Sequence, residues 1–378
     1  MSASKAATLL APFAQLEDPR IDRTKRYGLL DLIFIALCAV VSSANDCVGI
    51  ARFAKAKRVW LEKYLDLPEE TPSHDTFSRL FAALDGKAFM DGFLQWVKGL
   101  EEATKGKVVA IDGKTARATL DRRKDKNPLH VVSAWVTENQ LFLGQEVVDD
   151  KSNEITAIPK LLEVLELAGA IVTIDAMGCQ TEIADKIRAR GADYVLAVKG
   201  NQEHLEEDIV EAFLAVDECR STAKVDSHTE HNKGHGRVET RRTETMAVPK
   251  ELRNQDAWRD VRSIARCTRT YQEKGVAKSE VRYFISSLPP YAQRLARAIR
   301  GHWGVENGLH WVLDMYFAED RNRARTGNAA ANLALLRRWV ISLLRQDKAS
   351  KDSIEKKRLA AGWNDAAREA LLGLFIGN

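Results

Sequence analysis

Two aspartates in this chain each follow a run of apolar residues typical of a buried strand. Asp112 ends the run "KVVAID", and Asp175 ends "AIVTID" in the same way. The functional edge of an open α/β sheet lies at the carboxyl ends of its strands, so two such residues can share a cleft if their strands are neighbours. A single aspartate of this kind is more often an ordinary turn residue, and the repetition is what favours a site.

A third acid, Glu306, lies in "IRGHWGVENGLHWVLDMYFAED". Helical spacing predicts that it shares one face with a mainly apolar and aromatic stripe, made up of Ile299, His302, Trp303, His310 and Leu313. An acid on a packing face needs a partner. Gly301, Gly304 and Gly308 each cost about 1 kcal/mol in a helix interior relative to alanine, and a close approach by a backbone or a phosphate would explain them.

Carboxylates that are forced together repel and raise one another's pKa unless a cation lies between them. Their hard oxygen atoms suit Mg²⁺ or Mn²⁺. Asp112, Asp175 and the best third candidate, Glu306, therefore predict a divalent-metal site.

The segment that carries the two aspartates, residues 105–216, alternates strand and helix patterns. Runs rich in Val and aromatic residues precede a helix closed by Gly169, and the order is β-β-β-α-β-α-β-α. The turn "TENQ" predicts a hairpin between the second and third strands. A hairpin followed by helical crossovers predicts a mixed sheet with helices packed on it.

Residues 1–100 have the pattern of a helical domain. One buried helix is expected in "RYGLLDLIFIALCAVVSSAND" and one amphipathic helix in "DCVGIARFAKAKRVWLEKYL". In the next helix, Thr71 or Ser73 can cap, Pro72 fits the first turn and Gly86 ends it. With His74 and Arg79 exposed, this domain could be a DNA-binding helix-turn-helix module, and a plain helical bundle is the alternative.

The remaining chain divides into three parts. Residues 217–288 are polar and basic with three strand-like runs, which predicts a β-rich insertion. Residues 289–346 are helical and carry Glu306, so they are expected to complete the domain that bears the two aspartates. Residues 347–378 are expected to form a charged and then amphipathic C-terminal tail.

Composition excludes several classes of protein. The chain has 378 residues, 45% of them hydrophobic, and its net charge of +4 permits nucleic acid as a partner without demanding it. Five cysteines without a CxxC pair argue against a disulfide framework or a zinc ribbon. The "DGKT" motif lacks the first glycine of a P-loop, because Val108 stands there. The apolar segment 28–41 is too short to cross a bilayer and no signal peptide is evident, so a cytoplasmic protein is expected.

The chain resembles the Asp-Asp-Glu transposases of bacterial insertion sequences, and among them the H-repeat-associated group. The resemblance covers nearly the whole chain, and seven phrases in family order carry it: "DPRIDRTKRYGLLDLIFIALCAV", "AIDGKTAR", "KSNEITAIPKLLEVL", "VTIDAMGCQ", "VLAVKGNQ", "GHGRVETR" and "HWGVENGLHWVLDMYFAED". The resemblance implies a ribonuclease H-like catalytic domain with a β insertion before the last catalytic helix. It also implies that Asp112, Asp175 and Glu306 are the catalytic, metal-binding triad.

The implied reaction is two-metal phosphoryl transfer with two Mg²⁺ or Mn²⁺ ions about 3.5–4 Å apart. The same site would first cut DNA at the element ends and then join the exposed 3′ end to target DNA. The implied partner is double-stranded DNA, held by a homodimer when two ends are paired, and the implied location is the cytoplasm in association with the nucleoid.

One departure from the family pattern surrounds the glutamate. Many related transposases carry a Tyr, an Arg and a Lys spaced around it, and here Ile299, His302 and Leu313 stand at those positions. Arg300, His302 and His310 are candidate replacements for the phosphate contacts, and the sequence does not choose between them.

Further DNA contacts are predicted for polar, basic and aromatic side chains near the expected active edge and in the basic segment "HNKGHGRVETRR". The predicted contacts are Lys114, Arg117, Lys199, Asn201, Gln202, His235, Arg237, Arg300, His302 and Trp303. The ordinary alternatives are a solvated lysine, an exposed polar hairpin and a core aromatic residue.

Two other functions stay open. One is a metal-dependent DNA nuclease without strand transfer. The other is an inactive descendant that only binds DNA, which the presence of all three acids disfavours.

Overall fold

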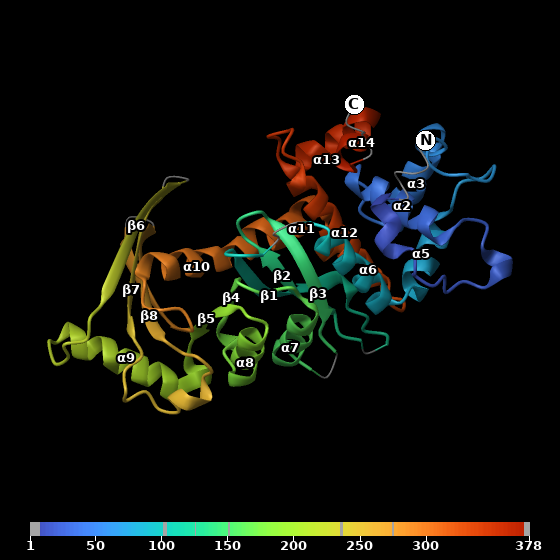
Figure 1. Cartoon of the computed structure of the whole chain (residues 1–378). Coiled ribbons are helices and arrows are strands. Elements are labelled where there is room, and N and C mark those ends of the chain that lie inside the picture. Colours follow the sequence, from blue (N-terminus) through green and yellow to red (C-terminus); the bar gives the residue numbers. More distant parts are fainter. Residues whose placement is uncertain are drawn as a thin grey trace.

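A nine-stranded mixed sheet runs through the part of the chain that the structure describes, in the order β3-β2-β1-β4-β5-β9-β8-β7-β6 (Figure 1). The structure is a computed structural model that describes residues 8–100, 104–124, 126–149, 152–234, 237–273 and 276–373. Helical regions precede and follow the strands along the chain, as the sequence predicts.

The first five strands occur in the predicted order, with helices between the later ones. They are β1 Val108–Ala116, β2 Leu129–Val136, β3 Leu141–Val147, β4 Ile171–Ile174 and β5 Asp193–Val198. The first three form an antiparallel meander, and β4 and β5 run parallel to β1. Parallel neighbours need crossover connections, which α7 (Glu154–Val164) and α8 (Thr181–Ala189) provide. The predicted mixed sheet is therefore confirmed.

The β-rich segment extends this sheet and does not form a sheet of its own. Its strands are β6 Asp226–Gly234, β7 Arg237–Ala247, β8 Ser263–Glu273 and β9 Val276–Ser286. Antiparallel pairing of β9 with β5 joins the two halves. The helix α9 (Glu203–Asp217) runs beside the second half (Figure 1). The strand β6 was not predicted, because "DSHTEHNKG" contains no apolar residue to reveal it.

Helix α10 (Ala292–Val305) packs on one face of the sheet, and α7 contacts β2 and β3 from the other side (Figure 1). Alternate residues of β1 face the two sides: Val108 packs with Ile299 of α10, whereas Val109 belongs to the main core. A Cβ at Gly304 would lie 2.6 Å from Thr137, so this glycine lets the helix approach the sheet. The close partner of Gly304 is thus the side chain of Thr137, just after β2.

The remaining helices belong to the N-terminal and C-terminal parts of the chain, and α6 and α12 also contact β3. They are α2 Leu29–Val41, α3 Cys47–Ala56, α4 Arg58–Leu61, α5 His74–Ala83, α6 Gly86–Lys98, α11 Trp311–Phe317, α12 Ala329–Gln346, α13 Ile354–Trp363 and α14 Asp365–Leu371. Short 3-10 turns are η1 Ala11–Phe13, η2 Asp22–Thr24, η3 Arg117–Thr119, η4 Ala176–Gly178, η5 Gly200–Gln202, η6 Gln255–Ala257 and η8 Glu319–Arg321. None of the described helices has the length and apolar character needed to cross a membrane.

Three details of the N-terminal prediction are wrong. The expected amphipathic helix is two helices, α3 and α4. Ser73 caps α5, accepting a hydrogen bond from the Thr76 backbone N at 3.3 Å, so Pro72 precedes the helix. Gly86 begins α6 and does not end α5, because the Asp85 side chain accepts from the Ala88 N at 2.8 Å and starts a new helix there.

The C-terminal segment is packed onto the N-terminal helices, which the sequence did not indicate. Helices α13 and α14 contact α2 (Figure 1). The buried Arg358 donates from Nη2 to the Val40 carbonyl at 2.9 Å, and the Arg368 side chain is fully buried. Charged residues made this segment resemble a solvated tail, but their side chains satisfy backbone carbonyls inside the fold.

Candidate functional site

Asp112 and Asp175 lie side by side on one face of the sheet. The parallel register pairs Ile111 of β1 with Ile174 of β4, so the aspartates that follow occupy equivalent places on strands about 4.8 Å apart. The Asp175 carboxylate caps the turn η4, accepting from the Met177 N at 3.1 Å and the Gly178 N at 3.4 Å. These two bonds fix one of its oxygens, Oδ1.

Glu306 reaches the same place from α10. It begins a π-helical turn, Glu306–His310, that joins α10 to α11. His310 lies between two acids, with Nδ1 3.3 Å from Glu306 Oε2 and 3.6 Å from Asp112 Oδ2. One ligand atom from each of Asp112, Glu306 and His310 lies within 4.8 Å of the others.

The predicted position of Glu306 on a packing face is wrong, because its side chain is 58% exposed. Leu313 and His310 are buried as the stripe predicted, but Trp303 is exposed. A π turn adds a residue to the helix, so side chains before and after it no longer follow one 3.6-residue spacing. The widened turn leaves Glu306 at the rim of the site.

Burial sets the protonation behaviour of the two aspartates. Desolvation raises the pKa of Asp112 from 3.8 to about 6, while the neighbouring His310 opposes the rise. Desolvation also raises the pKa of Asp175, and the charge of Glu154 adds to it. The pKa of Glu306 is lowered, mainly because its carboxylate is hydrogen-bonded to His310. The site therefore concentrates negative charge that the protein only partly compensates.

A fourth acid, Glu154, was not predicted. It begins α7, and its Oε1 lies 2.7 Å from Nε2 of His130, whose Nδ1 lies 2.7 Å from the Thr115 hydroxyl. A Cβ on Gly113 would meet Glu154 Oε1 at 2.1 Å, so only glycine allows the carboxylate this close behind Asp112. Glu154 raises the pKa of both Asp112 and Asp175. The sequence contains two signals, the glycine after Asp112 and an acid at a helix start. Neither signal indicates that these two residues lie in contact.

We expect Asp112→Asn to stabilise the metal-free protein at pH 7. Because the pKa of Asp112 is higher in the folded protein, the free energy of unfolding falls as pH rises from about 4 to about 6, and the loss persists above that range. Each pKa unit corresponds to 1.36 kcal/mol, so for a rise from 3.8 to about 6 the asparagine variant should gain on the order of 3 kcal/mol. Urea unfolding in EDTA at pH 7 and near pH 4 measures the difference, which should shrink at the lower pH. A variant that is less stable at pH 7 would contradict this account.

Lys114 lies further along β1, and Arg117 directly follows that strand. The Lys114 side chain is 9% exposed, and its Nζ lies 2.8 Å from Asp314 Oδ2 and 3.6 Å from Asp320 Oδ1. A phosphate would have to compete with both carboxylates for this ammonium. The Arg117 side chain, by contrast, is 84% exposed, and its Nε lies 3.6 Å from Asp320 Oδ2. Its guanidinium remains accessible.

Two of the predicted DNA contacts after β5 serve the fold. The Asn201 amide donates to the Ala176 carbonyl at 2.7 Å, and the Gln202 amide donates to the Cys179 carbonyl at 2.9 Å. Both therefore brace the turn that carries Asp175, and their donors are used. Lys199 is exposed at the same edge, and its charge lowers the pKa of Asp175.

Of the predicted contacts on α10, one bonds within the fold and two are at least partly exposed. His302 Nδ1 lies 3.2 Å from the Thr173 hydroxyl, and desolvation lowers the pKa of His302 to about 4, so at neutral pH it is not a cation for phosphate. Arg300 is half-exposed, 3.8 Å from Glu230. Trp303 is exposed beneath the guanidinium of Arg282, 4.8 Å from the ring centroid. His235 lies outside the described residues, as does the side chain of Arg237.

The donor set suits a hard divalent cation. Two carboxylates and an imidazole, from Asp112, Glu306 and His310, converge where Asp112 carries an unfavourable charge, and Asp175 lies beside them on the next strand and outside this cluster. His310 Nε2 is buried without a hydrogen-bond partner among the described residues. Oxygen-rich sites of this kind select Mg²⁺ or Mn²⁺, and a histidine ligand is also compatible with Mn²⁺.

Comparison with known proteins finds transposase families and proteins with transposase names along most of the chain. Residues 103–343 match the family described as "Transposase DDE domain", and residues 10–97 match "DDE_Tnp_1-associated". The chain is 38% identical over 369 residues to "Putative transposase YncI" of Escherichia coli O157:H7, covering 97% of this chain and 94% of that protein. It is 37% identical over 357 residues to "H repeat-associated putative transposase YhhI" of Escherichia coli K12, covering 93% of each.

Proposed function

Because the chain belongs to the DDE transposase family, and within it resembles the H-repeat-associated proteins along nearly its whole length, we propose that it cuts DNA at insertion-sequence ends and joins the 3′ ends to target DNA. The observation that supports this most is the equivalent placement of Asp112 and Asp175 on adjacent parallel strands. Glu306, in the π turn that follows α10, lies close to Asp112 and shares His310 with it.

We infer that Asp112, Asp175 and Glu306 hold two divalent ions. When bound, such ions favour the deprotonated form of the attacking hydroxyl and stabilise the leaving oxygen. The protein supplies the positions of the carboxylates. The turn η4 fixes Asp175, the strand pairing fixes Asp112, and His310 orients Glu306.

The residues around the triad would keep its charge and shape constant during the reaction. His302 is held neutral, so it adds no competing counter-charge next to the carboxylates. Lys114 is paired with Asp314, and its charge contributes to the lowered pKa of Glu306. Glu154 adds negative charge behind Asp112, which increases the affinity of the site for a cation. The reaction needs no covalent enzyme intermediate.

The test is to incubate the purified protein with duplexes that carry its own flanking ends, together with Mg²⁺ or Mn²⁺, and to map the strands. We expect cut ends and joined products, and EDTA should abolish both. Cutting that persists in EDTA would contradict the metal assignment. Cut ends without joined products would favour the alternative, a metal-dependent nuclease without strand transfer.

A further inference from the structure

A basic groove lies beyond the end of β1, outside the acidic site. Its volume is about 730 Å³. We define the basic groove by the five cationic side chains that line it, which are Arg117, Arg122, Arg123, Lys124 and Arg325. The other lining residues are Ala118, Leu120 and Asp121. A single acid among five cations makes this one of the more strongly charged hollows of the described surface.

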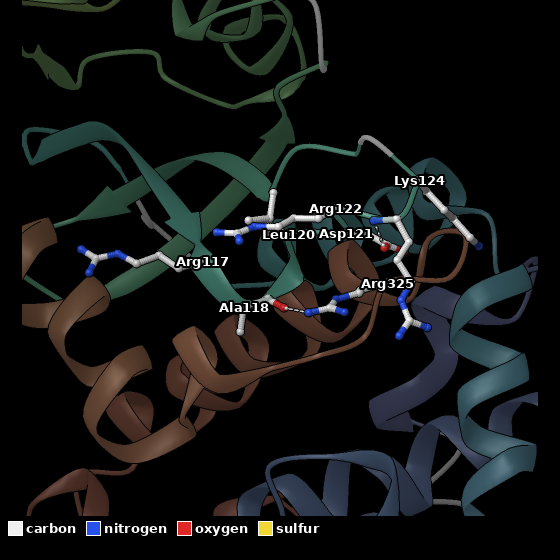
Figure 2. Close-up of a pocket in the computed structure, with 8 residues that line it drawn as sticks. Arg117, Ala118, Leu120, Asp121, Arg122, Lys124 and Arg325 are labelled. Atoms are coloured by element: carbon white, nitrogen blue, oxygen red, sulfur yellow. Dashed lines mark hydrogen bonds between the residues drawn. The ribbon is translucent and has the colours of Figure 1, made fainter.

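The positive charge of the groove is largely uncompensated. Arg325 donates from Nη2 to the Ala118 carbonyl at 3.1 Å, a bond that leaves its charge unpaired (Figure 2). Asp121 accepts from the backbone N of Arg123 at 3.2 Å, and the described residues offer no ion pair to the side chains of Arg122, Arg123 or Lys124. Cations gathered this closely repel unless an anion binds.

The groove is continuous with the elements that carry the acidic site. Arg117 directly follows β1, five residues after Asp112. At about 3.3 Å per strand residue, that is roughly 17 Å, or about half a turn of duplex DNA. Arg325 follows η8 and the Glu-bearing helix, and η8 contacts η3. DNA that presents a phosphate to Asp112 would therefore have Arg117, at one end of the groove, within about half a turn.

The arrangement of the cations favours a DNA backbone over a small anion. Figure 2 shows Arg117 at one end, Lys124 at the other, and Arg122 and Arg325 between them, so the charges form a row. A row matches successive phosphates, whereas a single phosphate needs donors that converge. The lining contains no aromatic side chain on which an unpaired base could stack, which favours duplex over single-stranded DNA.

We propose that the basic groove binds the phosphate backbone of duplex DNA beside the acidic site, without reading its sequence. This rests on the proposed function, because it assigns the groove to the same substrate. The contact positions the duplex and contributes affinity that depends on salt.

The test uses Arg122→Ala/Arg123→Ala, which changes two exposed turn residues. The matched control is Lys224→Ala/Lys250→Ala, which removes the same charge from exposed positions elsewhere. Binding of a 30-base-pair random duplex is measured by fluorescence anisotropy in EDTA, over a series of salt concentrations. We expect roughly tenfold weaker binding at low salt and a slope of log K against log salt reduced by about 2, with the control unchanged.

An unchanged slope in the groove variant would overturn the proposal, as would an equal effect in the control. Weaker binding of single strands alone, or competition by millimolar inorganic phosphate, would also overturn it. Arg325→Ala provides a second, independent variant, and thermal melting checks that each protein is folded. Because binding is measured in EDTA, a protein that cuts no DNA can still pass this test. A protein that cuts DNA can still fail the binding test. The proposed function and the role of the basic groove can therefore be rejected independently.

Discussion

Asp112→Asn is expected to slow DNA cutting by about a thousandfold or more. The substitution keeps the size of the side chain but removes the charge that would hold a divalent ion beside the scissile phosphate. Loss of about 4 kcal/mol of transition-state stabilisation, the scale of a metal contact, corresponds to about three powers of ten in rate. Single-turnover cutting of end-containing duplexes in Mg²⁺ measures it directly.

The variant also separates chemistry from folding and from DNA binding. Because Asp112→Asn should make the metal-free protein more stable, lost activity cannot be attributed to unfolding. Duplex binding in EDTA should be unchanged or tighter, since a negative charge is removed near phosphate. The matched control is Asp149→Asn, an aspartate 72% exposed and paired with Lys160, which should cut at the wild-type rate. Cutting within tenfold of wild type by Asp112→Asn would remove this residue from the proposed triad.

The placement of Asp112 and Asp175 was predictable because buried strands can be recognised in the sequence by their apolar runs. Apolar runs of Val and Ile end where each aspartate begins, and the alternation of strand and helix implies parallel neighbours. Register then follows from the burial of both strands, since a slip of one residue would turn each aspartate to the opposite face. The local pattern and the tertiary arrangement agree here.

Glu306 and Glu154 show where local patterns fail. A π turn has no signature in composition, so the helical spacing placed Glu306 on a packing face that it does not occupy. Glu154 approaches Gly113 only because β2 and α7 bring His130 and Glu154 together. That contact joins three separated segments. No spacing within any one of them encodes it.

The polar residues around the site were predicted as DNA contacts because the sequence shows which side chains are polar or charged. It does not show which groups of the folded protein they bond to. Lys114 is bonded to Asp314, 200 positions away, and the Asn201 amide is used by the turn that holds Asp175. In both cases the sequence gives no sign of a partner for the hydrogen-bond donor, and the fold supplies an acceptor from a residue distant along the chain. Arg122 and Arg325 are the opposite case, because only the fold brings these two basic residues, distant along the chain, to one groove.

Glu319→Ala is expected to lower the free energy of unfolding by about 3–5 kcal/mol. Glu319 and Arg338 are 2% and 1% exposed, with Arg338 Nη1 2.7 Å from Glu319 Oε1. Removing the carboxylate leaves a guanidinium buried without its counter-charge. Urea unfolding at pH 7 measures the loss, and Asp149→Ala, which breaks a solvated pair with Lys160, should have little effect.

The effect should reach the acidic site, because Arg338 Nε donates to the Ser133 hydroxyl at 3.3 Å and Ser133 pairs with Asp112 across β1 and β2. The ion pair thus fixes α12 and η8 behind the strand that carries Asp112. Glu319→Leu combined with Arg338→Met removes both charges and should recover much of the stability, since an apolar pair of similar volume avoids the desolvation of two ions. If the single variant were as stable as wild type, water would have to reach Arg338 in solution. If instead the double variant were as unstable as the single one, the loss would come from packing and not from an unpaired charge.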